Sequence, residues 1–434
     1  MTDAELEAGL LSCVHCGFCL PDCPTYRETG DEADSPRGRL VLMRGIAEGT
    51  QDFGANAPGS AGYHLDRCLG CRACETSCPS GVPYGSLLEE VRDRQERATK
   101  RGVGETILRE GMLQMLTSPA KMKAALIGGR LTGGAIPAPV ARFVGLPADT
   151  KMPMPADLSV SSRPAPALTP AAGVRRGRVA LATGCVMSVL YGPVHAATVR
   201  VLAANGVETI APPRQPCCGA LHGHQGKLAR ARSMAKETIE AFERVGGGAG
   251  LPHFDAVILN SAGCGSFLKG YGHLLEHEGG DWAERAAAFA AKVKDISEYL
   301  DDLPGGLRAM PTALSVRVTY HDACHLRHGQ RIYDAPRRLL KSIPGVTFVE
   351  TVDSDLCCGS AGVYNYLQPE MARSLLEKKV ANLLATRAEI VATGNPGCLA
   401  WIEQGMAGRI LPEGAVVPEV VHPVELLDRA YTVL

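Results

Sequence analysis

The stretch 13-CVHCGFCLPDCPTY-26 holds four cysteines within eleven residues, in the spacing C-x2-C-x2-C-x3-C-P. The same spacing returns in 68-CLGCRACETSCPSGVPYG-85, where each cysteine lies 55 residues after its counterpart. This spacing is typical of [4Fe–4S] ligation: three closely spaced thiolates bind one cluster, and the fourth cysteine usually binds the other. The two runs therefore predict two [4Fe–4S] clusters with exchanged fourth ligands.

The exchange defines two expected ligand sets. The first set is Cys13, Cys16, Cys19 and Cys78, and the second is Cys68, Cys71, Cys74 and Cys23. The alternative is structural zinc, which usually takes two separated pairs of ligands in a tetrahedral array. Two tandem runs of four cysteines fit that arrangement poorly, so the spacing favours iron–sulfur clusters.

Eight further cysteines form a second repeat, with offsets between 134 and 140 residues. They are Cys185, Cys217, Cys218 and Cys264 in the first copy, and Cys324, Cys357, Cys358 and Cys398 in the second. Clustered cysteines in a chain of this size indicate metal or redox sites rather than a disulfide framework. Buried free thiols are the alternative, but matched Cys-Cys-Gly groups favour an additional cluster or redox site.

Histidines gather near this second repeat. They are His222, His224, His321, His325 and His328. A neutral imidazole can bind iron or transfer a proton. The alternative is that each histidine lies at the surface or caps a helix.

The chain divides by pattern into four parts. Residues 1–118 are expected to form a helical two-cluster ferredoxin-like domain, because 35–49 and 85–100 show helical spacing of apolar residues. Residues 119–175 are rich in Pro, Ala and Gly, and predict a linker with one short helix. Residues 176–310 and 311–434 then alternate strands with helices.

The alternating pattern predicts two repeated α/β cysteine-rich (CCG) domains, so the fold class is α + α/β. Expected strands are RVALATGC, VETIA and DAVILNSAGC, matched by VRVTYHDAC, VTFVE and AEIVATGNPGC. Cys185, Cys264, Cys324 and Cys398 follow the carboxyl ends of these strands, where open α/β sheets place their sites. We expect each set of four cysteines to lie at its own rim.

Composition excludes several classes of function. The net charge is −1 and no long basic run occurs, so nucleic acid is not an expected partner. No G-x-G-x-x-G fingerprint for FAD or NAD is found. The N-terminus lacks a signal-peptide pattern and no apolar stretch is long enough to span a bilayer, which predicts a cytoplasmic protein with at most peripheral membrane contact.

A resemblance adds to these inferences. It is carried by both cysteine runs together with SPRGRL, NSAGCGS, YHDACHLRHGQ, CCGSAGVYN, GNPGC and HPVELLD. Together these motifs resemble the iron–sulfur subunit of bacterial glycolate oxidase, from residue 13 to about 430. The resemblance implies an electron-transfer subunit without catalytic residues of its own and without activity alone. FAD would lie in flavoprotein partner subunits that oxidise glycolate to glyoxylate, and a membrane quinone would be the acceptor at the inner face of the cell membrane.

Related families leave alternatives open. Iron–sulfur subunits of lactate and glycerol-3-phosphate dehydrogenases share the two-part plan, and so do heterodisulfide reductase subunits, which reduce a disulfide themselves. The cysteine-rich domains of heterodisulfide reductase end in CxxC, whereas Ser261 and Asn395 stand at the first position of that motif here. This departure puts a five-cysteine non-cubane cluster in doubt. A regulatory iron–sulfur sensor is a third, weaker alternative.

Overall fold

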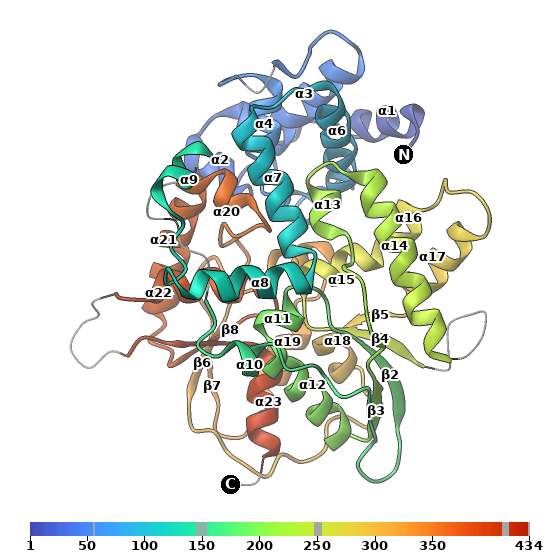
Figure 1. The fold of residues 1–434 in the computed structure, drawn as a ribbon, viewed down its shortest axis with the longest axis vertical. Coiled ribbons are helices and arrows are strands. Elements are labelled where there is room, and N and C mark those ends of the chain that lie inside the picture. The colour runs from blue at the N-terminus through green and yellow to red at the C-terminus, as the bar shows by residue number, and fades with distance from the viewer. Residues whose placement is uncertain are drawn as a thin grey trace.

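The computed structural model describes residues 1–54, 57–144, 146, 150, 154–246, 254–409 and 416–432. A helical N-terminal unit lies at one end of the molecule, and two α/β units with separate sheets lie beside each other at the other end (Figure 1). The predicted fold class, a helical ferredoxin-like part followed by two α/β parts, is confirmed.

The N-terminal unit consists of short helices around the cysteine runs. They are α1 (Asp3–Leu11), α2 (Pro24–Thr29), α3 (Pro36–Ala47), α4 (Ala61–Asp66), α5 (Ala73–Thr76) and α6 (Tyr84–Ala98). The helices predicted over 35–49 and 85–100 are confirmed as α3 and α6. Ser35 caps α3 by accepting a hydrogen bond from the Gly38 N–H, and Pro36 occupies the first turn, where its missing N–H costs nothing.

The core of this unit is small and contains sulfur. Leu6, Met43, Leu65 and Leu87 are fully buried, and Cys68 is among the cysteines that pack with them. Burial of a large apolar side chain contributes about 1.5–3 kcal/mol, so a core with few such side chains is stabilised only to a limited extent.

The segment expected to be a linker contains more secondary structure than predicted. After α7 (Val103–Leu116) come α8 (Pro119–Arg130), α9 (Ala138–Phe143), α10 (Leu158–Ser161) and strand β1 (Leu168–Thr169). The expectation of one short helix in 119–175 is therefore wrong for the described part; residues 145, 147–149 and 151–153 lie outside it. Packing explains the difference, since Met122, Leu126 and Leu158 bury themselves against Val189 of the first α/β unit.

The first α/β unit contains a five-stranded sheet with the order β1-β3-β2-β4-β5. Its other strands are β2 (Gly177–Ala182), β3 (Val207–Ile210), β4 (Ala256–Leu259) and β5 (Val293–Asp295). Only the edge strand β1 pairs antiparallel among the described strands. The helices of this unit are α11 (Met187–Leu190), α12 (Gly192–Ala204), α13 (Ala220–His224), α14 (Leu228–Glu243), α15 (Ala262–Lys269), α16 (Tyr271–Leu274), α17 (Trp282–Ala291) and α18 (Ile296–Asp301).

The second α/β unit repeats this plan with the parallel order β7-β6-β8-β9. Its strands are β6 (Arg317–Tyr320), β7 (Thr347–Val349), β8 (Ile390–Ala392) and β9 (Glu419–Val421). Its helices are a π-helical turn (His325–Gly329), α19 (Asp334–Ser342), α20 (Tyr364–Leu367), α21 (Pro369–Ala385), α22 (Pro396–Met406) and α23 (Pro423–Tyr431). All six strands predicted from the sequence are present.

The two α/β units share one core. Leu181 and Ile258 of the first sheet belong to the same buried cluster as Val318 and Tyr320 of the second. The shared core fixes the two sheets against each other, so that the cysteine-bearing strand ends of both units meet. Among the described residues, no helix combines the length and the apolar character needed to cross a bilayer.

Candidate metal centres

The first cysteine run borders a small cavity in the N-terminal unit. The cavity has a volume of about 30 Å³. Its sulfur lining is Cys13, Cys16, Cys19, Cys74 and Cys78. Positive φ angles at His15 (55°) and Gly17 (86°) fold the loop back on itself. A Cβ at Gly17 would lie 2.9 Å from Arg37 Nη1, so the turn favours glycine there.

A second cavity, of about 20 Å³, lies next to the first. Its sulfur lining is Cys23, Cys68, Cys71 and Cys74. Cys68 Sγ accepts hydrogen bonds from the Gly70 N–H at 3.4 Å and from the Tyr84 hydroxyl at 3.6 Å. The structure thus places Cys78 beside the first run and Cys23 beside the second, while Cys74 borders both cavities.

Two buried arginines set the charge around the second cavity. Burial alone raises the pKa of a thiol, but the guanidinium groups of Arg39 and Arg92 outweigh it and lower the pKa of Cys68. Burial raises the pKa of Cys71 and Cys74 well above the usual value. These thiols lose their protons readily only when a bound metal supplies the compensating positive charge.

Arg39 is itself held by a buried polar network. It is fully buried and donates to the His64 carbonyl at 2.7 Å, the Thr25 hydroxyl at 3.0 Å and Asp34 Oδ1 at 3.1 Å. Arg37, the neighbouring arginine of the SPRGR motif, instead pairs with Glu32 at the surface. The sequence did not distinguish these two roles, although Arg39 stands beside Leu40 on the apolar side of α3.

The eight remaining cysteines border one shared cavity. This cavity has a volume of about 220 Å³ and lies between the two α/β units. Its sulfur lining is Cys185, Cys217, Cys218, Cys264, Cys324, Cys357, Cys358 and Cys398, together with Cys68 of the N-terminal unit. Each set lies at the strand ends of its own unit, and the core that the two sheets share turns both sets of strand ends toward this one cavity.

Within each unit the thiols contact one another in the same order. In the first, Cys185 Sγ lies 3.3 Å from Cys217 Sγ, Cys217 contacts Cys218, and Cys218 contacts Cys264. In the second, the same order runs through Cys324, Cys357, Cys358 and Cys398. The glycine after each Cys-Cys pair has a positive φ, 87° at Gly219 and 91° at Gly359. Both sets are therefore compact enough to act on one metal centre each.

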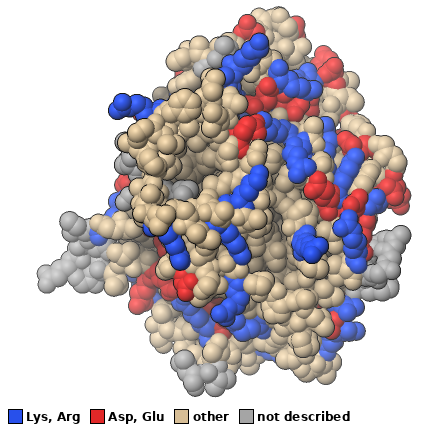
Figure 2. Space-filling model, in the orientation of Figure 1, with Lys and Arg blue, Asp and Glu red and all other residues tan. Residues whose placement is uncertain are grey.

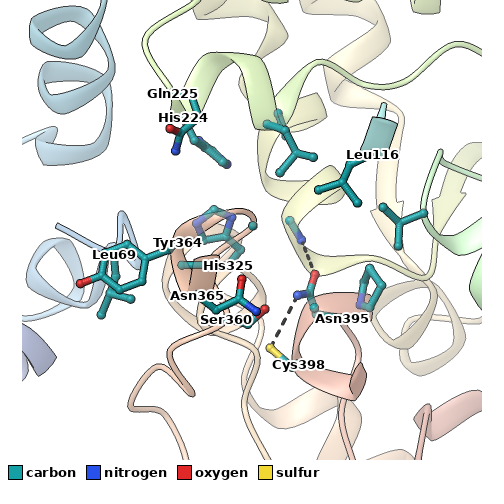
Figure 3. Close-up of a pocket in the computed structure, with 18 of the residues that line it drawn as sticks. Leu69, Leu116, His224, Gln225, His325, Ser360, Tyr364, Asn365, Asn395 and Cys398 are labelled. Carbon is teal, nitrogen blue, oxygen red and sulfur yellow. Dashed lines mark hydrogen bonds between the residues drawn. The ribbon is translucent and has the colours of Figure 1, made fainter. Parts of the chain in front are cut away.

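Asn395 occupies the position of the missing cysteine and connects the two units. Its Oδ1 accepts a hydrogen bond from the Gly263 N–H of α15 at 3.1 Å, and its Nδ2 donates to Cys398 Sγ at 3.6 Å (Figure 3). Ser261, its counterpart in the first unit, is buried. The replacement of cysteine at 395 thus exchanges a fifth thiol for a contact between units.

The predicted histidines have different positions. His321 is buried with a ring nitrogen close to the Cys358 and Cys398 thiols. His224 pairs with Glu89 of α6, and His325 and His328 contact Gly70 O and Thr76 Oγ1 of the N-terminal unit. His222 is buried in α13. Three of the five therefore hold the N-terminal unit against the α/β units.

The residues present fit iron–sulfur clusters. Both N-terminal cavities are bordered by thiols, the second also has buried arginines and N–H donors around it, and thiolate is the soft ligand that iron–sulfur clusters take. Asp22 is the only carboxylate residue in either lining, so the described donors do not form the cluster of oxygen ligands that magnesium or calcium takes.

Fold and sites together define an iron–sulfur protein with a dicluster domain and two cysteine-rich domains. A family model described as "4Fe-4S dicluster domain" matches residues 9–82, and one described as "Cysteine-rich domain" matches residues 179–269 and 318–403. The probable glycolate oxidase iron-sulfur subunit of Bacillus subtilis (strain 168) is 40% identical, over 98% of this chain and 94% of its own length. The glycolate oxidase iron-sulfur subunit of Escherichia coli (strain K12) is 34% identical, over 98% and 95%.

The chain belongs to the family of glycolate oxidase iron-sulfur subunits. A more distant relative is a fumarate reductase (CoM/CoB) subunit of Methanothermobacter marburgensis, 28% identical over 98% of this chain and 73% of that protein. The resemblance seen in the sequence motifs is thereby confirmed, and iron–sulfur clusters are its cofactors.

Proposed function

We propose that this chain is the electron-transfer subunit of a flavin-dependent glycolate dehydrogenase. Flavoprotein subunits would oxidise glycolate to glyoxylate, and this chain would carry the electrons to a quinone-type acceptor at the inner face of the cell membrane. Removing two electrons as a hydride requires a flavin or nicotinamide, whereas iron–sulfur clusters accept electrons singly when bound. The chain is therefore expected to be inactive alone.

One observation carries this proposal: the sulfur-lined cavities adjoin one another. The first and second cavities share Cys74, and the second and the large cavity share Cys68 and Leu69. Burial, and after it the nearby Cys324 thiol, raises the pKa of the Cys71 thiol, so the second run lies close to the second α/β unit here. Metal centres in these cavities would form an uninterrupted series from the N-terminal surface to the space between the α/β units, as a relay requires.

The exposed end of this series is a suitable surface for the flavoprotein. Cys16 is exposed at the first cavity. Val14 and Phe18 of the same run are each more than half exposed, with Phe18 at 65%, and so are Leu11 before the run and Val41 of α3. Exposed apolar residues beside a redox centre favour a protein partner, because their burial stabilises the complex without moving the centre far from the donor.

Reconstitution tests the relay. The isolated chain and the chain mixed with the flavoprotein subunits are each assayed for glycolate oxidation with a quinone analogue. We expect turnover only in the mixture. A Phe18→Asp variant should weaken association about tenfold or more while leaving iron content unchanged, with Val103→Asp, on exposed α7, as the matched control. Glycolate oxidation by the isolated chain would contradict the proposal.

The ligand sets are part of the proposal. Cys13, Cys16, Cys19 and Cys78 would bind one cluster, and Cys68, Cys71, Cys74 and Cys23 the other. Support comes from the position of each fourth cysteine in the cavity of the opposite run.

Cys78→Ser tests this exchange. It should alter the spectrum of the cluster at the first run, and Cys23→Ser that of the cluster at the second, both followed by electron paramagnetic resonance of the reduced protein. The reverse pattern would refute the exchange.

A second candidate function is thiol–disulfide chemistry at the large cavity. It is favoured by the convergence of both cysteine sets on one space of about 220 Å³. Reduction of a disulfide by the isolated, reduced chain, with two electrons from the chain and two protons from solvent consumed for each disulfide cleaved to two thiols, would support it. Absence of that activity, together with glycolate turnover in the reconstituted complex, would leave electron transfer as the one supported function.

A further inference from the structure

Among the described residues, His321 is the one predicted histidine that lies with two cysteine thiols at a spacing suited to a metal ion. It follows strand β6 directly and is fully buried. One of its ring nitrogens and the sulfur atoms of Cys358 and Cys398 all lie within 4.8 Å of one another. Donors at this spacing fit around a single metal ion, since a tetrahedral ion with bonds of about 2.0–2.3 Å separates its ligand atoms by roughly 3.5–4 Å.

The hydrogen bonding of His321 identifies the free nitrogen. Nδ1 lies 3.1 Å from the Ser354 carbonyl, which can only accept, so Nδ1 carries the proton and donates it. Nε2 then presents a lone pair, and it is buried with no oxygen or nitrogen partner among the described residues. Metal-binding histidines almost always donate the other N–H to a carbonyl or carboxylate in this way.

The same carbonyl is held from a second side. Lys379 is buried and its Nζ donates to Ser354 O at 3.3 Å and also to Asp353 O. A carbonyl with two donors is fixed in position, and it fixes the orientation of the His321 ring in turn. The buried ammonium also supplies positive charge next to the thiols of Cys357 and Cys358.

The first α/β unit lacks this histidine. Val179 of β2 pairs with Ala256, the first residue of β4. Val318 of β6 pairs in the same way with Ile390, the first residue of β8, so Val179 and Val318 are equivalent positions in the two sheets. His321 therefore corresponds to Ala182, which has no donor atom. The two cysteine sets are alike in order, but only the second has a nitrogen donor at this place.

We propose that His321 Nε2 is a metal ligand, with Cys358 and Cys398, in a mixed nitrogen–sulfur centre of the second α/β unit. The centre of the first unit would lack a nitrogen ligand at the matching position, Ala182. The metal is iron or zinc, since both take imidazole and thiolate ligands. The two cysteine-rich domains thus hold chemically different centres.

Metal content and nitrogen coupling test this proposal on the full chain purified without oxygen. Iron, zinc and sulfide are counted for the unaltered protein, His321→Ala and His222→Ala, the latter replacing the buried histidine beside the other cysteine set. We expect His321→Ala and Cys398→Ser both to lose the metal of the second unit, and His222→Ala to keep it. Circular dichroism checks that each variant folds.

Two further results decide the ligand role. His321→Cys should restore the metal, because a thiolate replaces the lone pair. Pulsed electron paramagnetic resonance, or X-ray absorption at the edge of the metal found, should show a histidine nitrogen in the unaltered protein and none in His321→Cys. Full metal content in His321→Ala, or an unchanged nitrogen signal in His321→Cys, would overturn the proposal.

A second inference concerns the surface formed by α8 and α9. Residues 118–144 contain four cations and no Asp or Glu. The cations are Lys121, Lys123, Arg130 and Arg142. Four large apolar side chains of this segment are at least half exposed. They are Ile127 (60%), Leu131 (92%), Val140 (50%) and Phe143 (61%).

On α8 the two kinds of residue share one side. Lys123, Ile127 and Arg130 are spaced by four and three residues, so they form one stripe, while Met122 and Leu126 are buried in the core beneath. Figure 2 shows Lys and Arg side chains over α8, next to a broad surface without charged groups. An exposed stripe of apolar and basic residues is typical of segments that lie in the interface of an anionic membrane.

We infer that α8 and α9 bind the surface of an anionic lipid bilayer. This inference rests on the proposed function, since a quinone-type acceptor lies in the membrane. Binding is measured directly, by sedimentation of the isolated chain with vesicles of phosphatidylcholine alone or with one quarter phosphatidylglycerol, so its outcome does not depend on glycolate turnover.

We expect binding to the phosphatidylglycerol vesicles only, weakening as salt is added. Lys121→Glu, Lys123→Glu and Arg130→Glu together should reduce it at least tenfold, and Leu131→Ser with Phe143→Ser should also reduce it. The matched control is glutamate at Arg200, Arg244 and Arg338, which are exposed elsewhere. Equal binding of the α8 and control variants, or no binding to either vesicle, would overturn the inference.

Discussion

Replacing Arg39 with methionine should destabilise the N-terminal unit more than any surface change on the same helix. The Arg39 guanidinium is fully buried and makes three hydrogen bonds, at 2.7, 3.0 and 3.1 Å. Removing one partner of a buried ion pair costs about 3–5 kcal/mol, because the other charge stays buried. In this variant Asp34 keeps its ion pairs with His64 at 3.0 Å and Arg67 at 3.4 Å. We therefore expect the free energy of unfolding to fall by an amount at the lower end of that range, about 3 kcal/mol.

The matched control is Arg44→Met on the same helix. Arg44 pairs with Glu48 at the surface, where both side chains are about half exposed, and such pairs contribute about 0.3–0.5 kcal/mol. Hydrogen exchange of α3 and α4 in the cluster-loaded protein measures the loss of local stability in each of the two variants. The double variant Arg39→Met, Asp34→Asn should lose less than the sum of its single changes, because it removes the orphaned charge.

A redox readout accompanies this test. Arg39 and Arg92 lower the pKa of the Cys68 thiol, so loss of the Arg39 charge should move the midpoint potential of the neighbouring cluster to more negative values. Equal exchange rates for Arg39→Met and Arg44→Met, or strictly additive losses in the double variant, would refute the assigned role of the buried network.

Three further predictions follow from the α/β units. Gly359→Ala should lower the melting temperature more than Gly219→Ala, since the new Cβ would lie 2.6 Å from a helix backbone oxygen at Gly359 but 3.1 Å at Gly219; equal losses would contradict this. Burial raises the pKa of Asp295 to about 6, so the stability that its protonated form contributes is lost as the pH rises from about 4 to above 6. The neutral side chain of Asp295→Asn avoids this loss. In denaturant titrations the variant should therefore gain up to about 3 kcal/mol of stability over the unaltered protein between pH 4 and pH 7. Tyr364→Phe removes a 2.9 Å hydrogen bond from its hydroxyl to a carbonyl of the N-terminal unit and should cost about 1 kcal/mol in the same assay, whereas no change would show that water replaces the bond.

The sequence allowed prediction of features that depend on local spacing. The cysteine runs and the strand ends at Cys185, Cys264, Cys324 and Cys398 were predictable because ligand spacing and apolar runs are properties of neighbouring residues. The edge strand β1 was not predicted, since it has only two residues and exists through its pairing with β3. Strands this short carry no periodicity that a sequence pattern can reveal.

The site was predictable only as far as each motif acts alone. Nothing in the spacing indicated that both cysteine sets meet in one cavity, because this depends on the core shared by the two sheets. The same holds for the histidines, which the sequence grouped together. Only packing distinguishes His321, which faces thiols, from His325, whose Nε2 contacts Gly70 O at 3.0 Å in the N-terminal unit.

The contacts between units favour one direction for the proposed relay. Several of them hold the second cysteine run: Arg92 donates to the carbonyls of Cys68 and of His224, His325 contacts Gly70 O, and Arg331 donates to Glu75 O. A centre held on several sides by the α/β units keeps its distance to the large cavity. The first run keeps Cys16 and its apolar neighbours exposed, free for a partner. Electrons from a flavoprotein would therefore enter at the first run and move inward through the second.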